Sequence, residues 1–147
     1  YDRAMPIDIN DKGQAFEPIQ TPAMDINYSY LRKLFDSAMN DNQISEESLS
    51  KIDKMDDYVI EHFRISFGNR IMNQINTIVP IFVACGGSKE DAIDLTLSRK
   101  LLVKLEGHFE EYVKSGLKKL LDLMAKTYGE GRLQYSERII TNLLRKL

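Results

Sequence analysis

Apolar residues recur every three or four positions along most of this 147-residue chain, and glycines or polar turns interrupt the recurrence. Between residues 28 and 39 the spacing places six apolar side chains on one side of a helix: Tyr28, Leu31, Leu34, Phe35, Ala38 and Met39. This spacing matches the 3.6-residue period of an α-helix that buries one face. We therefore expect an all-α fold in which such stripes form the core.

Capping residues and helix breakers divide the pattern into separate helices. Beyond the helix that starts at Tyr28, we expect a second helix after Ser45, a third from Gly68 to the Gly86–Gly87 pair, a fourth from Ser88 to Gly107, a fifth over about 109–128 and a last one capped by Ser136. Inside the third, Pro80 should kink the helix or mark a restart, because it lacks an amide donor. The sum is a helical bundle of about five to six helices.

The first 27 residues differ from the rest. Residues 4–9 (Ala-Met-Pro-Ile-Asp-Ile) are typical of a short strand, with Pro6 confining it to an edge or a strand start. Residues 10–27 are rich in Pro, Asp, Asn, Gln and Thr and show no period, which is typical of a connector. We therefore divide the chain into residues 1–27, a short N-terminal strand remnant with its connector, and residues 28–147, a helical domain.

Composition excludes several classes of protein. An apolar content of 43% and a charged content of 29%, with a net charge of −2, fit a globular domain without a global basic field for nucleic acid. Cys85 is the only cysteine, and His62 and His108 lie far apart, so we expect no disulfide within the chain and no metal site. We expect Cys85 to be buried or inert. The longest apolar run, residues 78–85, is too short to span a membrane, which favours the cytoplasm and no membrane partner.

Catalytic motifs are absent from this sequence. It contains no G-x-x-x-x-G-K-[ST] phosphate loop, no G-x-S-x-G elbow and no H-E-x-x-H motif. The nearest cluster, residues 86–89 (Gly-Gly-Ser-Lys), has neither the spacing nor the order of a phosphate loop. We therefore expect this chain alone to catalyse nothing.

Arginines are the remaining candidates for a functional site. Arg70 follows Gly68 in the first turn of the third helix, where a fixed positive charge at a helix start commonly meets phosphate. The plain alternative is that Arg70 pairs with an acid such as Asp56 or Glu61. Arg3 stands just before the expected strand, and its plain alternative is a solvated terminal side chain.

Four phrases together resemble McrB-type AAA+ NTPases in order and spacing. Residues 2–8 (Asp-Arg-Ala-Met-Pro-Ile-Asp) resemble the phrase that ends the α/β core of these proteins, and residues 67–75 (Phe-Gly-Asn-Arg-Ile-Met-Asn-Gln-Ile) are similar to their sensor-2 segment. Residues 99–107 and residues 136–139 are similar to two elements that follow in the same family. The resemblance covers most of the chain.

The resemblance implies that this chain is the C-terminal helical lid of a larger motor, an expectation that also fits an opening at Tyr1 without an initiator Met. Residues 1–27 would end the α/β core, Arg3 would be the arginine finger and Arg70 the sensor-2 residue. The full-length protein would bind ATP or GTP with Mg²⁺, although this fragment alone would hold neither. It would form a ring with copies of itself, act with a nuclease subunit, and contact DNA indirectly in restriction or phage defence.

Two other interpretations stay open at this point. The chain could be a free-standing helical interaction module that docks an exposed apolar stripe, such as that of residues 137–147, in a partner's groove. It could also be a helical nucleic-acid binder that uses the helix between Gly86 and Gly107, with a test on Lys100, Lys104 and Lys119.

Overall fold

The computed structural model describes residues 17, 19–20, 22–105 and 111–147. Within these residues the chain forms helices and no strand, so the expected all-α bundle is confirmed. The α-helices are α1 (Tyr28–Asp41), α2 (Glu46–Phe63), α3 (Gly68–Ala84), α4 (Lys89–Thr96), α5 (Glu111–Tyr128) and α6 (Gln134–Lys146). The strand expected at residues 4–9 lies outside the described residues. None of the described helices is both long and apolar enough to span a membrane.

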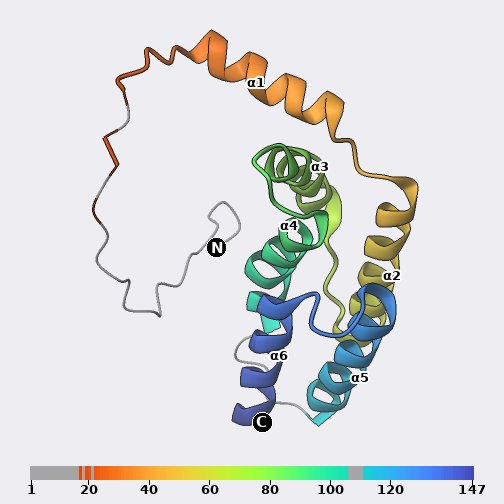
Figure 1. Ribbon diagram of the computed structural model, residues 1–147. Coiled ribbons are helices and arrows are strands. Elements are labelled where there is room, and N and C mark those ends of the chain that lie inside the picture. The colour runs from red at the N-terminus through yellow and green to blue at the C-terminus, as the bar shows by residue number, and fades with distance from the viewer. Residues whose placement is uncertain (1–16, 18, 21, 106–110) are drawn as a thin grey trace.

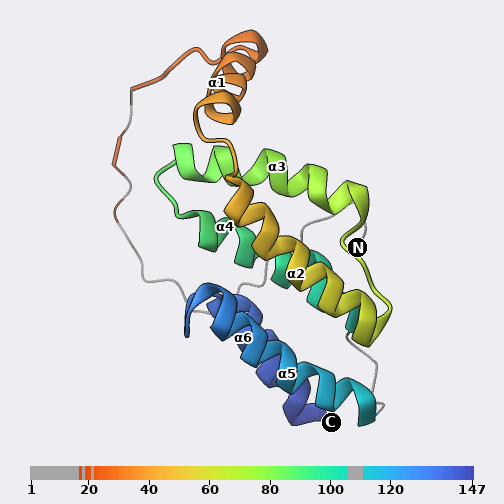
Figure 2. The ribbon, with the colours of Figure 1, turned by 90° about the vertical axis from the view of Figure 1, so that its right-hand side faces the viewer.

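Five of the helices pack around one core, and α1 lies apart from most of them. α2 packs on α5 and α3 packs on α4, while α6 lies beside both α4 and α5 (Figures 1 and 2). α1 crosses the end of the bundle that α3 forms and contacts α3 (Figure 1). One end of the bundle is thus covered by α1. The opposite end, which is farther from α1, is formed by α5 and α6.

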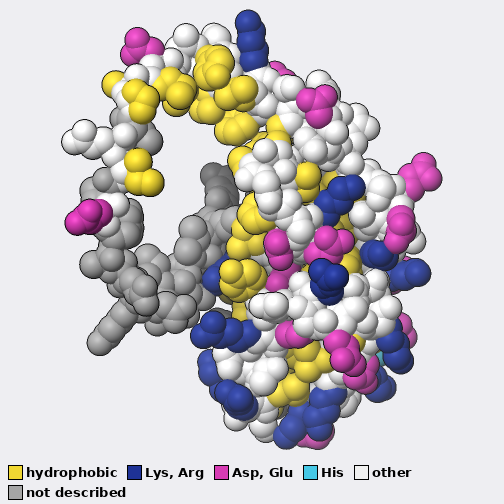
Figure 3. Space-filling model, in the orientation of Figure 1, with side chains coloured by type: hydrophobic (Ala, Val, Ile, Leu, Met, Phe, Trp, Pro, Cys, Tyr) yellow, Lys and Arg dark blue, Asp and Glu magenta, His cyan; other side chains and the backbone are white. Residues whose placement is uncertain are grey.

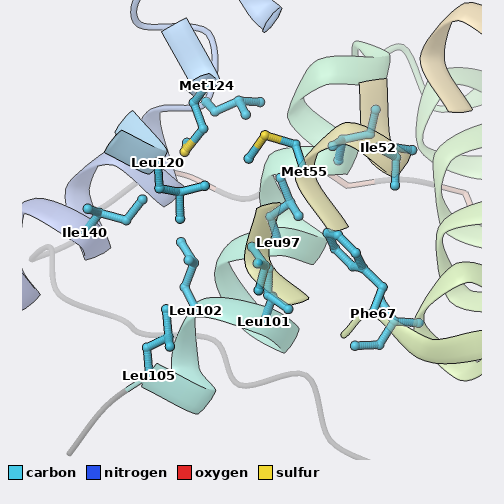
Figure 4. Packing of buried hydrophobic residues seen from close by; sticks show 14 of the residues in the cluster. Ile52, Met55, Phe67, Leu97, Leu101, Leu102, Leu105, Leu120, Met124 and Ile140 are labelled. Atoms are coloured by element: carbon cyan, nitrogen blue, oxygen red, sulfur yellow. The ribbon is translucent and has the colours of Figure 1, made fainter. Parts of the chain in front are cut away.

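The core draws side chains from distant parts of the sequence. Met55 of α2, Leu120 and Met124 of α5 and Ile140 of α6 lie in one cluster with Leu97 of the segment after α4 (Figure 4). Each of these five side chains is almost fully buried. Burying a side chain of this size contributes about 1.5–3 kcal/mol, so these contacts hold the four segments together.

The fourth helix is not the single regular helix expected up to Gly107. α4 ends at Thr96, a π-helix follows over Leu97–Leu101 and a 3₁₀-helix over Leu102–Leu105. All four leucines at the ends of these two segments are buried. The changed helix type thus leaves all four leucines on the core side.

The apolar face of α1 is the clearest departure from the expected core. Of its six predicted core side chains only Ala38 is buried, whereas Leu34 is 48% exposed and Phe35 41% exposed. Tyr28 and Leu31 are exposed as well. Figure 3 shows hydrophobic side chains gathered on the part of the molecule that α1 forms. The helical spacing was therefore right about the helix but wrong about what its apolar face touches.

The end of α3 bears on two further expectations. The helix continues through Pro80, which is buried, so the proline marks no restart, and the alternative of a kink stays a prediction. Cys85 was expected to be buried or inert; its inertness stays a prediction, but its side chain is exposed. The reason is its position as the residue that ends α3, where its amide donates back to the Ile81 carbonyl and the chain turns outward through Gly86 at φ 91°.

Candidate functional site

A tight corner between α2 and α3 sets the position of Arg70. Arg64, the residue after α2, lies in the left-handed region (φ 55°), and Gly68 opens α3 with φ 62°. Between them, the Phe67 amide donates to Asp56 Oδ1 over 2.7 Å, and the Phe67 ring is buried. Asp56 thereby satisfies the backbone amide of Phe67, the residue before α3, whose own side chain makes no capping hydrogen bond. The first turn of α3 is thus anchored to α2.

Arg70 is exposed and lines a shallow hollow of about 530 Å³ on the surface of α3. The other described residues that line it belong to the same helix: Asn73, Gln74, Thr77 and Ile78. Their spacing of three, four, seven and eight residues from Arg70 puts them on one face. The Thr77 hydroxyl donates to the Asn73 carbonyl over 2.9 Å, as hydroxyls inside helices commonly do.

The chemistry of this face suits an anion. A guanidinium offers several donors in a plane and keeps its charge at any physiological pH, and amide side chains such as Asn73 and Gln74 add neutral donors. The start of a helix adds a partial positive charge. Such a surface can contact phosphate oxygens, and the described residues that line it include no carboxylate, imidazole or thiol. Arg3, the second predicted site residue, lies outside the described residues.

A second cluster, built on Asp94 of α4, was missed by the sequence analysis. Asp94 is 2% exposed, and its Oδ2 and Oδ1 accept hydrogen bonds from the backbone amides of Tyr135 (2.7 Å) and Ser136 (2.8 Å). Asp94 therefore caps the start of α6 from another helix. The expectation that Ser136 caps this helix is wrong, because Ser136 lies inside α6 and is buried.

The surroundings of Asp94 favour a structural role. Burial raises the pKa of its carboxyl more than the hydrogen bonds from Ser136 and Tyr135 lower it. The neighbouring hollow of about 380 Å³ mixes acidic, basic, amide and aromatic walls, which are Phe82, Asp91, Asp94, Leu95, Arg132, Gln134 and Tyr135. Both carboxylate oxygens of Asp94 already accept backbone donors. No local pattern could have revealed this role, because the partners lie 41 and 42 residues further along the chain.

Two other expectations concerned metal ions and nucleic acid. Among the described residues, no group of three or more His, Cys, Asp or Glu side chains could hold a metal ion. Of the lysines considered for nucleic acid, Lys104 and Lys119 are exposed but Lys100 is only 8% exposed. Lys100 lies in the π-helix on the core side, so its part in an exposed basic face is corrected.

Comparison with known families places the chain. Residues 18–147 match the family model described as a domain of unknown function, DUF8727. The chain belongs to the DUF8727 family. The matched range takes in all six α-helices, both hollows and the Asp94 cap, so the described fold is that of a DUF8727 domain. No curated protein and no solved structure matches the chain.

Proposed function

We propose that this DUF8727 domain is the C-terminal helical lid of a McrB-like AAA+ ATPase or GTPase, and that it couples nucleotide state to ring motion in a DNA restriction or phage-defence motor. The observation that supports the proposal is the place of Arg70. It is exposed in the first turn of α3, on a face with three further polar side chains, and that face is hollowed. A guanidinium held in this way can grip a phosphate with two donors.

The roles follow from the chemistry of the two arginines. Arg70 would contact the nucleotide phosphates from the lid, and the corner that Asp56 holds would transmit that contact to α2. Arg3 would serve as the arginine finger toward a neighbouring subunit. ATP or GTP with Mg²⁺ would be held by the full-length protein rather than by this chain, in a ring of identical subunits in the cytoplasm. A nuclease subunit would be the partner, and DNA would be contacted indirectly.

The first prediction compares two arginine variants of the full-length protein that contains this domain. Arg70→Ala should lower the rate of nucleotide hydrolysis at least about tenfold, because a charge-assisted contact of about 1.5–3 kcal/mol is lost. Arg64→Ala removes another exposed arginine six residues away and should leave the rate unchanged. Arg3→Ala should cost about 10³-fold or more if it is the finger. A phosphate-release assay measures all three.

Three results would contradict the lid proposal. The first is that the 147-residue chain alone hydrolyses ATP or GTP or binds either tightly, because the chain has no phosphate loop. The second is the absence of a phosphate loop from the rest of the full-length protein. Equal rates in the Arg64→Ala and Arg70→Ala variants would be the third.

The exposed face of α1 favours a second candidate, a helical interaction module without nucleotide chemistry. Contiguous apolar side chains on a surface often mark a contact with another protein. Here Tyr28, Leu31, Leu34 and Phe35 are exposed together on one helix. The stripe of residues 137–147, which was the expected docking surface, is instead turned inward, with Ile140 and Leu143 buried. Such a module would lay α1 in an apolar groove of its partner.

The second prediction tests whether the α1 face is free for such a partner. Replacing Leu31 and Leu34 together by serine should change the free energy of unfolding of the chain by less than about 1 kcal/mol, because exposed side chains lose little packing. Urea unfolding followed by circular dichroism measures this. A loss above about 2 kcal/mol would show that the face is packed within the molecule, which rules out α1 as a docking helix. A finding that the full-length protein hydrolyses nucleotide would favour the lid instead.

A further inference from the structure

α6 presents an outer face that is cationic and free of carboxylates. Its inner side chains Ile140 and Leu143 are buried in the core. Its exposed positions are all polar or basic: Gln134, Tyr135, Arg138, Thr141, Asn142, Arg145 and Lys146. The one acid of the helix, Glu137, is only partly exposed and accepts a hydrogen bond from the Gly131 amide. Arg138 lies too far from the C-terminus of the helix for the helix dipole to explain it.

The charge of the molecule is unevenly divided between its helices. Residues 111–147 hold eight Lys and Arg against four Asp and Glu, whereas α2 holds six acids against two lysines. Figure 3 shows many Lys and Arg side chains over the part of the molecule where α5 and α6 lie. The ion pairs Arg32–Asp36 and Lys51–Glu47 belong to α1 and α2. Among the described residues, no ion pair is seen for Arg138, Arg145 or Lys146 of α6.

We propose that the outer face of α6 itself binds double-stranded DNA, a direct contact that the lid proposal, with its indirect contact, does not include. Arginine and lysine bind phosphates, while Gln, Asn, Thr and Tyr are side chains that commonly donate to phosphates or base edges. On α6 these types lie at intervals of three, four and seven residues, which is one face of the helix. A polyanion is the partner that a face with three cations and no exposed acid complements in charge.

The shape of the face favours duplex DNA over RNA. A helix of 13 residues is about 20 Å long and about 10–12 Å wide with its side chains. The major groove of B-form DNA is about 12 Å wide and admits a helix, whereas that of A-form RNA is too deep and narrow. α6 is also held rigidly, because Asp94 binds its first turn and its inner face is packed in the core. Such anchoring lowers the entropic cost of binding.

The test uses the 147-residue chain and a fluorescently labelled 20-base-pair DNA duplex. Anisotropy should show binding that weakens as KCl rises from 50 to 200 mM. The double variant Arg138→Gln with Arg145→Gln should bind about tenfold more weakly, and the slope of log K against log salt should fall by about 2. Asn142→Asp adds a negative charge to the face without removing a cation, and it should also weaken binding.

The matched control is Lys33→Gln with Lys54→Gln, which removes two exposed charges from α1 and α2. It should keep the affinity and the salt slope of the unchanged chain. Absence of DNA binding by the unchanged chain would overturn the proposal, and so would equal losses in the control and in the α6 variant. An RNA duplex of the same sequence that binds equally well would overturn it too, because it would show a general attraction to polyanions. None of these results bears on nucleotide hydrolysis, so the lid proposal is tested separately.

Discussion

We expect Phe67→Ala to lower the free energy of unfolding by about 3–5 kcal/mol, the usual cost of removing a buried phenylalanine ring. The ring is 2% exposed and belongs to the core at the corner between α2 and α3 (Figure 4). Its removal leaves a cavity directly before the first turn of α3, so the placement of Arg70 should loosen as well. Urea unfolding measures the loss, and a fall in Tm of about 10 °C should accompany it.

Phe35→Ala is the matched control, because it removes the same side chain from the exposed face of α1. The expected loss is below about 1 kcal/mol. Similar losses for the two variants would contradict the placement of Phe67 in the core and of Phe35 on the surface. The pair therefore tests directly which apolar stripes of the sequence the fold buries.

The second large effect concerns the Asp94 cap. In Asp94→Asn one of the two oxygens becomes an NH₂ group, which cannot accept from the Tyr135 or Ser136 amide that it faces. A buried donor without an acceptor costs about 1–3 kcal/mol, and the remaining bond loses its charge assistance, so we expect a loss of about 2–4 kcal/mol. Asp91→Asn, at an exposed position of the same helix, should change stability by less than about 0.5 kcal/mol. Equal effects would contradict the capping role.

The difference in stability between the unchanged protein and Asp94→Asn should change with pH in a definite direction. Because burial raises the pKa of Asp94, the folded protein binds the proton more readily than the unfolded chain does. Its contribution to stability therefore falls as the pH rises from the ordinary pKa of aspartate through the raised one. The stability margin of the unchanged protein over Asp94→Asn, which does not titrate there, should widen as the pH is lowered from 7 through that window. A margin that narrows would show that the hydrogen bonds outweigh burial.

Local patterns predicted the helices because their causes lie within one or two turns. Ser45 and Ser88 were expected to cap α2 and α4, and their hydroxyls accept from the amides of Ser48 and Asp91, three residues further on. The glycines at 68 and 86 adopt the positive φ values that end or begin a helix. The placement of Arg70 in the first turn of α3 followed from the same kind of signal.

Local sequence patterns could predict only part of the candidate site. An exposed arginine near a helix start can be predicted from the sequence, but the hollow beside it depends on how α3 lies in the bundle. The Asp94 cap depends on a hydrogen bond from the Tyr135 amide, 41 residues further along the chain, and no periodicity in the sequence indicates such a bond. The outer face of α6 became visible only when the packing of Ile140 and Leu143 showed which side of that helix faces outward.

The sequence by itself determined that this chain forms helices and where most of them begin and end, because caps, glycines and apolar spacing act over a few residues. Only the tertiary structure decided which stripes are buried. The stripe of α6 lies in the core and that of α1 lies on the surface, although both have the spacing of a buried helix face. The change of helix type after Thr96 was also decided there. In each case the physical reason is the same, since burial depends on what the rest of the chain places opposite a face.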